Sequence, residues 1–116
     1  MFRFLILLSL LQAKIMTLEV ASFEKKLFSD SVLIDVRTPK EFKEGHIKGA
    51  INVSVTSDDF SAIINEFPKD RPIFVYCRSG KRSTRAVNEI KTMGFPRIIE
   101  LAGGFNAWVK AKQTTE

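Results

Sequence analysis

Residues 73–87 constrain the fold of this 116-residue chain more than any other stretch. The apolar run from Ile73 to Tyr76 is typical of a buried strand, and Cys77, the only cysteine, follows it directly. A short loop containing Gly80 then leads into a helical pattern. A strand that turns sharply into a helix aims backbone N–H groups and the positive end of the helix dipole at the residue where the strand ends. The stretch therefore predicts a site for a thiolate, for an anion, or for both.

Strand and helix patterns alternate along the rest of the chain. Compact apolar and β-branched runs predict strands at 32–36, 50–53, 73–76 and 97–101. Helical spacing of apolar residues, or a proline that opens a helix, predicts helices at 20–28, 40–44, 60–67, 86–93 and 105–109. This alternation indicates an α/β domain with a mostly parallel sheet covered on both faces. Ligands of such sheets bind at the carboxyl ends of the strands, where Cys77 falls.

Composition favours one folded domain, which we assign to residues 14–116, because 45% of the residues are apolar and 27% are charged. The net charge is +5. The segment 78–85 contains no acidic residue but four basic ones, namely Arg78, Lys81, Arg82 and Arg85. No aromatic interleaving or nucleic-acid motif accompanies these charges, so we expect a small anionic substrate and not a nucleic acid.

The cysteine count limits the chemistry. A single cysteine excludes an internal disulfide framework and a cysteine-rich zinc site. With one histidine as well, a metal site would need mainly carboxylates, and no such cluster stands out in the sequence. We therefore expect no protein metal site.

Residues 1–13 differ in character from the domain. They contain an apolar run from Phe4 to Leu11 with Arg3 as the only charge, and their last three residues resemble an export cleavage site. We favour an export signal; the alternatives are an apolar helix packed on the domain and an uncleaved membrane anchor. An export signal predicts a periplasmic or exported protein that begins near Lys14, and a retained leader predicts a cytoplasmic one. Membrane contact is expected only through an uncleaved leader.

Three features predict that the Cys77 thiol is reactive and is not merely a small buried apolar group. Gly80 permits dihedral angles at which successive N–H groups converge on one point. Arg78, Lys81 and Arg82 supply positive charge, and the following helix adds its dipole. Each feature favours the thiolate, which is the nucleophilic form of cysteine.

The segment 77–83, CRSGKRS, resembles the active-site loop of single-domain rhodaneses, the thiosulfate sulfurtransferases. Three more segments match this family in the same order along the chain: LIDVRTP at 33–39 with Glu41 and Phe42, GHIKGAIN at 45–52, and GGFNAW at 103–108. The resemblance covers about residues 17–112. It implies a rhodanese-like domain with a central, mostly parallel, five-stranded sheet and helices on both faces.

The resemblance also implies a persulfide mechanism that needs no metal or organic cofactor. Cys77 would attack the outer sulfur of thiosulfate, expel sulfite and carry the sulfur to an acceptor, which is cyanide in the usual assay and a thiol or a protein in the cell. Arg78 and Lys81 would bind the oxyanion of the substrate, and the bound persulfide would be stabilised by loop N–H groups. The rest of the implied active-site loop consists of Ser79, Gly80, Arg82, which supports the loop, and Ser83, which begins the following helix.

Three alternatives stay open beside the sulfurtransferase. Phosphatases and arsenate reductases of the same fold place an arginine after cysteine and five intervening residues, whereas Arg82 follows Cys77 after four, so their chemistry is disfavoured. A sulfur-relay module would pass sulfur between proteins and use free thiosulfate poorly. An inactive rhodanese-like module typically lacks the cysteine that this chain retains. We expect a monomer in each case.

Other residues receive structural assignments. Asp35 and Arg37 end a predicted strand near the site, where we expect a supporting ion pair or loop hydrogen bonds. His46 invites comparison with a Cys–His dyad, but it lies in a turn motif, and an already ionised thiol needs no base. Phe105, Trp108 and Val109 are predicted to pack in the core, and Phe28 is predicted to share the apolar face of its helix with Phe23.

Overall fold

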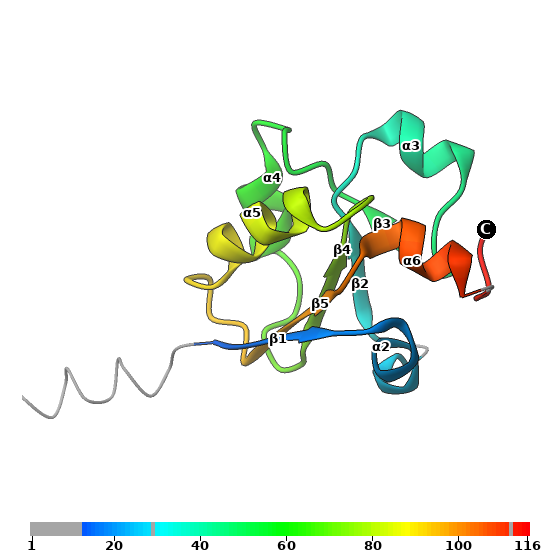
Figure 1. Cartoon of the computed structure of the whole chain (residues 1–116). Helices are drawn as coiled ribbons and strands as arrows, with labels where there is room; N and C mark the ends of the chain where they lie inside the picture. Colours follow the sequence, from blue (N-terminus) through cyan, green and yellow to red (C-terminus); the bar gives the residue numbers. More distant parts are fainter. Residues whose placement is uncertain (1–12, 29, 112) are drawn as a thin grey trace, which may run out of the picture.

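A computed structural model describes residues 13–28, 30–111 and 113–116. Strands and helices alternate along the chain as the sequence patterns predict (Figure 1). The elements are β1 (Lys14–Leu18), α2 (Val20–Lys26), β2 (Val32–Asp35), α3 (Pro39–Glu44), β3 (Ile51–Asn52), α4 (Phe60–Asn65), β4 (Ile73–Tyr76), α5 (Lys81–Ile90), β5 (Arg97–Leu101) and α6 (Gly104–Lys110). In these ranges no helix has the length and apolar character needed to cross a membrane. Of the predicted leader, residues 1–12 lie outside the described residues, and Ala13 packs against the core.

The five strands form one sheet in the order β1-β5-β4-β2-β3, and each neighbouring pair is parallel. The predicted α/β fold with a five-stranded sheet is therefore confirmed. The strand patterns located four of these strands but missed β1. The residues of this edge strand are exposed or half-buried, so it lacks the continuous apolar run of a central strand.

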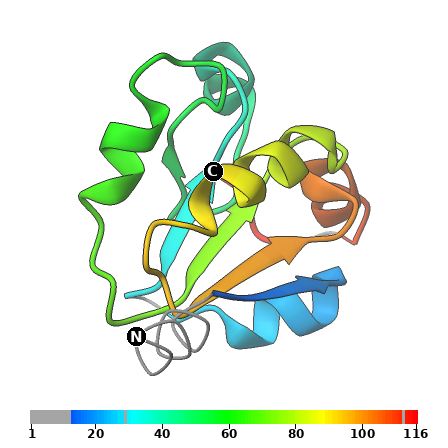
Figure 2. The same cartoon turned by 90° about the vertical axis from the view of Figure 1, so that its left-hand side faces the viewer.

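Helices cover both faces of the sheet and divide the core into two clusters (Figure 2). On one face, α4 and α5 contribute Ile64 and Ile90 to a cluster that also contains Val75 and Cys77. On the other face, α2 and α6 contribute Phe23 and Trp108. Every residue of β2 and of β4 is buried because both faces of these central strands are covered.

Two apolar side chains that were predicted to face the core are exposed. Helix α2 ends at Lys26, so Phe28 lies beyond the helix and is 73% exposed, whereas Phe23 on the same predicted face is buried. In α6, Val109 is 50% exposed because Trp108 occupies the core-facing position. The helical periodicity was correct in both segments, but the end of α2 and the orientation of α6 were not predicted.

Helix α3 stands at the carboxyl ends of the strands and buries none of its own residues (Figure 1). Pro39 occupies its first turn, as predicted. The Thr38 side chain accepts a hydrogen bond from the Glu41 N–H at 3.3 Å, and the Glu41 carboxylate accepts one from the Thr38 N–H at 3.1 Å. This capping box satisfies two backbone donors at the start of the helix and sets the position of the Glu41 side chain.

Candidate active site

Cys77 directly follows β4, a central strand between β5 and β2. The residue is 1% exposed, and its Sγ accepts a hydrogen bond from the Gly80 N–H at 3.0 Å. Gly80 has a φ of +121°, a conformation that favours glycine, and it lets the chain fold back onto the sulfur within three residues. Helix α5 begins directly afterwards at Lys81, two residues before the predicted start at Ser83. The Gly80 N–H therefore approaches the sulfur closely, whereas the glycine pattern predicted that several successive N–H groups would converge there.

The start of α6 holds this loop from the other side. The Phe105 N–H donates to the Cys77 carbonyl at 2.7 Å, and the Asn106 N–H donates to the Arg78 carbonyl at 3.0 Å. Gly104 permits the close approach, because a Cβ at this position would lie 2.5 Å from the Cys77 carbonyl oxygen. The sequence identified 103–108 as a motif, but its contact with the cysteine loop depends on tertiary structure.

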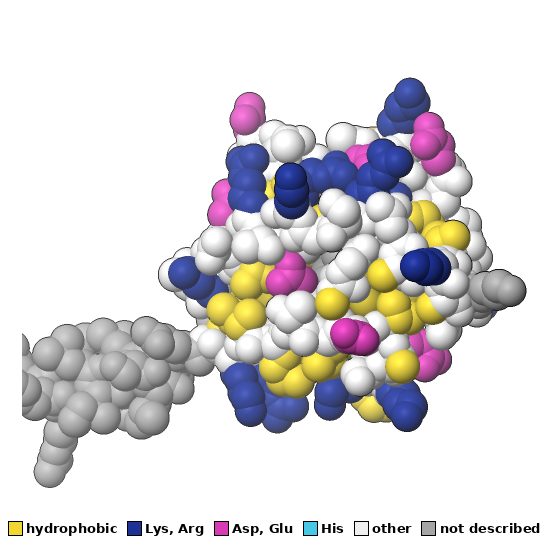
Figure 3. Space-filling view, in the orientation of Figure 1, with side chains coloured by type: hydrophobic (Ala, Val, Ile, Leu, Met, Phe, Trp, Pro, Cys, Tyr) yellow, Lys and Arg dark blue, Asp and Glu magenta, His cyan; other side chains and the backbone are white. Residues whose placement is uncertain are grey.

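The basic residues of the loop fall into two groups. Arg78 and Lys81 are exposed beside the buried Cys77, where they are free to meet a ligand from solvent. Figure 3 shows Lys and Arg side chains gathered over the upper part of the molecule, near α3 and α5. Arg82 instead binds Glu41, with its Nη1 and Nη2 at 2.5 and 2.9 Å from the two carboxylate oxygens.

The ion pair between Arg82 and Glu41 changes the acidity of both groups. The hydrogen bonds from Arg82 lower the pKa of Glu41 to about 2, and those to Glu41 raise the pKa of Arg82. Sequence reasoning included Glu41 in a family motif but did not assign it to the site. The only available signal was its position three residues after Thr38, which predicts a capping box and not a contact with the loop.

Asp35 and Arg37 form the expected ion pair at the end of β2. The Arg37 Nη2 lies 2.6 Å from Asp35 Oδ2 and also donates to the Gly45 carbonyl at 2.7 Å. The guanidinium lies over the Phe105 ring, 4.3 Å from its centroid. Burial is the largest single influence on the pKa of Arg37 and lowers it, but the hydrogen bonds to Asp35 and the charge of that carboxylate together raise the pKa overall. The pair ties β2, the 45–49 turn and α6 together beneath the site.

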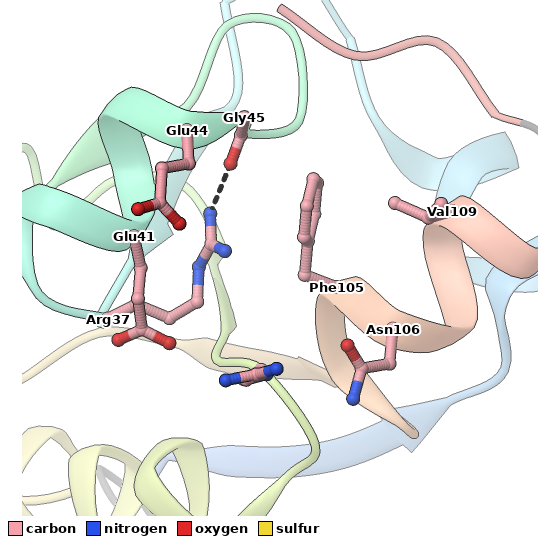
Figure 4. Close-up of a pocket in the computed structure, with 8 residues that line it drawn as sticks. Arg37, Glu41, Glu44, Gly45, Phe105, Asn106 and Val109 are labelled. Carbon is pink, nitrogen blue, oxygen red and sulfur yellow. Dashed lines mark hydrogen bonds between the residues drawn. The ribbon is translucent and has the colours of Figure 1, made fainter.

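A cleft of about 360 Å³ opens between α3 and α6, and Cys77 itself is not among the residues that line it. Figure 4 shows Glu41 and Glu44 on one side of this cleft and Phe105, Asn106 and Val109 on the other, with Arg37 between them. Arg78, the neighbour of Cys77 in sequence, completes the lining. Phe105 is half-buried: it packs against the core cluster that contains Trp108, as predicted, but it also forms a wall of the cleft and covers Arg37. Trp108 is buried, as predicted.

Ser83 and Glu100 lie beneath the loop. Ser83 is fully buried, and its Oγ is 3.5 Å from Cys77 Sγ and 2.5 Å from Glu100 Oε2. Sequence reasoning placed Ser83 on the loop and gave no role to Glu100, which lies among the buried residues of β5 between Ile99 and Leu101. A charged residue at a buried strand position was the one signal that could have identified it.

His46 belongs to the turn after α3. Its Nδ1 lies 2.9 Å from the Phe42 carbonyl oxygen, its ring stacks on the Phe42 ring, and its Nε2 is 3.5 Å from Glu116 Oε2. These contacts agree with the structural role predicted for this histidine. In the described part of the chain, no three His, Cys, Asp or Glu side chains come together in a way that could hold a metal ion.

A parallel sheet that presents one cysteine at a strand end, under a tight loop and beside exposed cations, defines an α/β domain with a single-cysteine loop at the end of a central strand. Comparison with known protein families agrees with this class. The family described as "Rhodanese-like domain" matches residues 19–111 of this chain. The chain therefore belongs to this family.

Several similar proteins have names that describe an activity, and each of these names is that of a sulfurtransferase. The chain is 40% identical over 84 residues to the uncharacterized protein YqhL of Bacillus subtilis, a match that covers 70% of this chain and 65% of that protein. It is 37% identical over 87 residues to thiosulfate sulfurtransferase 16, chloroplastic, of Arabidopsis thaliana, covering 66% of this chain and 72% of the relative. Other relatives at 34% and 37% identity are also named as sulfurtransferases. These relatives support sulfurtransferase activity in general.

A solved structure confirms the fold independently. The structure of a rhodanese-related protein from Thermoplasma volcanium superposes with a TM-score of 0.77 at 23% identity, covering 87% of this chain and 97% of the other. At this identity the similarity supports the architecture of the sheet and helices, and the chemistry must be argued from the site.

Proposed function

We propose that this protein is a sulfurtransferase that carries a sulfane sulfur as a persulfide on Cys77. The observation that carries this proposal is the position of Sγ at the end of β4, with the Gly80 N–H 3.0 Å away and the start of α5 beside it. A persulfide adds one sulfur and one negative charge at this point. A backbone donor and a helix N-terminus are suited to hold such an anion without a dedicated base.

Thiosulfate is the proposed donor, as the name of the Arabidopsis relative suggests. The Cys77 thiolate would attack the outer sulfur, forming a new S–S bond while the sulfur–sulfur bond of thiosulfate breaks and its electron pair leaves with sulfite. Exposed Arg78 and Lys81 would bind the sulfonate oxygens during this step. An acceptor such as cyanide would then take the outer sulfur and regenerate the thiolate.

The geometry argues against phosphate chemistry at the same loop. A phosphatase loop must surround a tetrahedral oxyanion and supply an arginine to it, but here the Gly80 N–H already lies against the sulfur. Arg82, the arginine at the end of the loop, gives two nitrogens to Glu41.

The size of the cleft supports a second possibility for the acceptor. Thiosulfate does not need a volume of about 360 Å³, and the wall of Phe105 and half-exposed Val109 is apolar. A sulfur-relay module would place a segment of an acceptor or donor protein in this cleft. In that case free thiosulfate would be a poor substitute for the protein donor.

The test begins with the reduced, folded protein and thiosulfate. Its intact mass should increase by one sulfur, and addition of cyanide should release thiocyanate. Cys77→Ser should abolish both results while its circular dichroism spectrum stays that of the wild type. A folded, reduced wild type that acquires no sulfur from thiosulfate or from a persulfidated protein would overturn the proposal.

The two acceptor models differ in their kinetics. Rapid loading by a persulfidated donor protein, combined with a very high KM for thiosulfate, would identify a relay module. Efficient turnover with thiosulfate and cyanide, without any protein partner, would identify a thiosulfate sulfurtransferase.

A further inference from the structure

Glu100 is an ionisable residue in a buried strand, and the proposed sulfur transfer does not use it. It is 8% exposed and belongs to β5, on the same sheet face as Ile98 and beneath α5. Its Oε2 accepts hydrogen bonds from the hydroxyls of Ser83 at 2.5 Å and Thr84 at 3.3 Å. Its Oε1 accepts one from the Thr17 hydroxyl at 3.3 Å. Among the described residues, no cation forms an ion pair with this carboxylate.

One atom, Ser83 Oγ, connects Glu100 to the Cys77 sulfur by hydrogen bonds. Cys77 Sγ lies 3.5 Å from Ser83 Oγ, and the thiol donates to this oxygen. Ser83 has a single hydroxyl proton and two acceptors for it, Glu100 Oε2 at 2.5 Å and the Gly80 carbonyl oxygen at 3.0 Å, and the shorter distance and the carboxylate charge favour donation to Glu100. The result is a directional chain from thiol to hydroxyl to carboxylate. Cys77 and Ser83 are both buried, so bulk water does not replace a member of the chain.

Of the described charged groups around Cys77, Glu100 is the one carboxylate that hydrogen bonds connect to the thiol, through Ser83. Arg82 of α5 lies close enough for a Cys77 thiolate to help raise the pKa of its guanidinium, after the larger contribution from Glu41 of α3. Among the described residues, the Glu41 carboxylate accepts hydrogen bonds from Arg82 and Thr38 and from neither Cys77 nor Ser83. The other charged groups at this edge of the sheet are the Asp35–Arg37 pair and the exposed Arg78 and Lys81.

We propose that Glu100 is a positioning residue that shares one proton with the Cys77 thiol through the Ser83 hydroxyl. When the thiol ionises, its proton moves to Ser83 Oγ while the Ser83 proton moves to Glu100 Oε2. The S–H bond breaks, a carboxylic O–H bond forms, and Ser83 remains a neutral hydroxyl that now donates to the thiolate. The net charge of the buried group does not change, which avoids a second buried anion beside the first.

This role extends the proposed function, because the sulfur cycle alternates between thiolate and persulfide anions on Cys77. Protonated Glu100 would remain neutral beneath either anion and would return the proton when the thiol forms again. The proposal rests on Cys77 as the sulfur carrier, but its test reads the thiol alone and needs no sulfur donor.

The experiment measures the rate constant for alkylation of Cys77 by iodoacetamide from about pH 4 to about pH 10. The full chain is used as wild type, Glu100→Gln and Ser83→Ala. Two groups that share a proton titrate as a pair, so the wild-type rate should rise in two steps. Glu100→Gln should show one step, about one pH unit or more below the upper wild-type step, because no second negative charge opposes the thiolate. Ser83→Ala should also show one step, at a higher pH than Glu100→Gln, because it keeps the carboxylate.

Glu89→Gln is the matched control. Residue 89 lies on α5 six positions after Ser83, about 9 Å along the helix axis, so this variant removes a carboxylate without touching the chain of hydrogen bonds. It should keep the wild-type profile. Circular dichroism verifies that each variant is folded, and Ser83→Ala decides the question if Glu100→Gln does not fold.

Three results would reject the shared proton. The first is a wild-type alkylation rate that rises with pH in a single step at the same pH as in Glu100→Gln. The second is a single wild-type step that Glu100→Gln only shifts to lower pH through loss of charge. The third is a two-step pH profile that persists in Ser83→Ala. A two-step wild type that forms no persulfide would overturn the proposed function alone. Normal persulfide formation with a one-step profile would overturn the role of Glu100 alone.

Discussion

Arg82 and Glu41 form a two-pronged ion pair that joins the cysteine loop to α3, with nitrogen–oxygen distances of 2.5 and 2.9 Å. The same Glu41 carboxylate closes the capping box with Thr38 at the start of α3. One side chain therefore stabilises a helix terminus and anchors the start of α5. Because Arg82 is paired with Glu41 inside the protein, Arg78 and Lys81 are the exposed loop cations that a ligand could contact.

Glu41→Gln should reduce stability in a pH-dependent way. The pKa of Glu41 is about 2 in the folded protein and 4.5 ordinarily, so the ion pair stabilises the fold fully above about pH 4.5. This contribution is lost as the pH falls towards 2. At neutral pH we expect the variant to lose about 1–2 kcal/mol of unfolding free energy, a value reduced by the partial exposure of both side chains.

Urea denaturation of wild type and Glu41→Gln at several pH values measures this difference. It should shrink steadily between about pH 4.5 and pH 2. Glu24→Gln, on an exposed position of α2, serves as the control and should match the wild type. A difference that stays constant across this range would contradict the assignment of the ion pair.

Gly104→Ala should distort the cysteine loop. The new Cβ would lie 2.5 Å from the Cys77 carbonyl oxygen and 2.7 Å from the Arg78 carbonyl carbon, which are backbone atoms that cannot rotate away. We expect a loss of about 1–3 kcal/mol from overpacking in addition to the strain of positive φ, and a large loss of sulfur transfer.

Gly49→Ala separates these two effects. Gly49 has a φ of +86°, but a Cβ there meets nothing within 4 Å, so this variant carries the backbone strain without the clash. Thermal unfolding and the thiocyanate assay on both variants provide the comparison. Equal stability and equal activity in the two variants would show that α6 does not constrain the loop.

Arg78→Ala should raise the KM for thiosulfate about five- to tenfold, corresponding to the loss of about 1 kcal/mol from one exposed charge contact. Because Arg78 is exposed, stability should stay unchanged, and added salt should reduce the difference between variant and wild type. Arg97→Ala removes the same charge at the amino end of β5 and should leave the KM unaltered. Steady-state kinetics at low and high salt decide this prediction, and equal KM values in both variants would exclude Arg78 from donor binding.

Asp35→Asn should be strongly destabilising, by about 3–5 kcal/mol, because it leaves a buried guanidinium without its carboxylate. Arg37 is 3% exposed, and its side chain donates three hydrogen bonds to the Asp35 carboxylate. Asp70→Asn breaks the exposed pair with Arg71 and should have little effect. Urea denaturation of the two variants compares them directly; similar losses would show that burial of the Asp35–Arg37 pair is energetically unimportant.

The sequence determined the local features of this protein. The run from Ile73 to Gly80 specified a buried strand, a terminal cysteine and a glycine turn, because strand patterning and glycine conformation depend on residues that are neighbours in the chain. Alternation of strand and helix patterns specified the parallel α/β architecture for the same reason. The four family motifs added the expected chemistry of the loop.

Tertiary structure alone decided which distant side chains complete the site. Arg82 meets Glu41 across 41 positions, Ser83 meets Glu100 across 17, and α6 closes over the Cys77 carbonyl. β1 likewise becomes a strand only by pairing with β5, since its own pattern is too exposed to specify one. Hydrogen bonds and ion pairs of this kind need atoms within about 3 Å. No spacing in the sequence encodes that proximity, because it arises only when the sheet brings the carboxyl ends of its strands together.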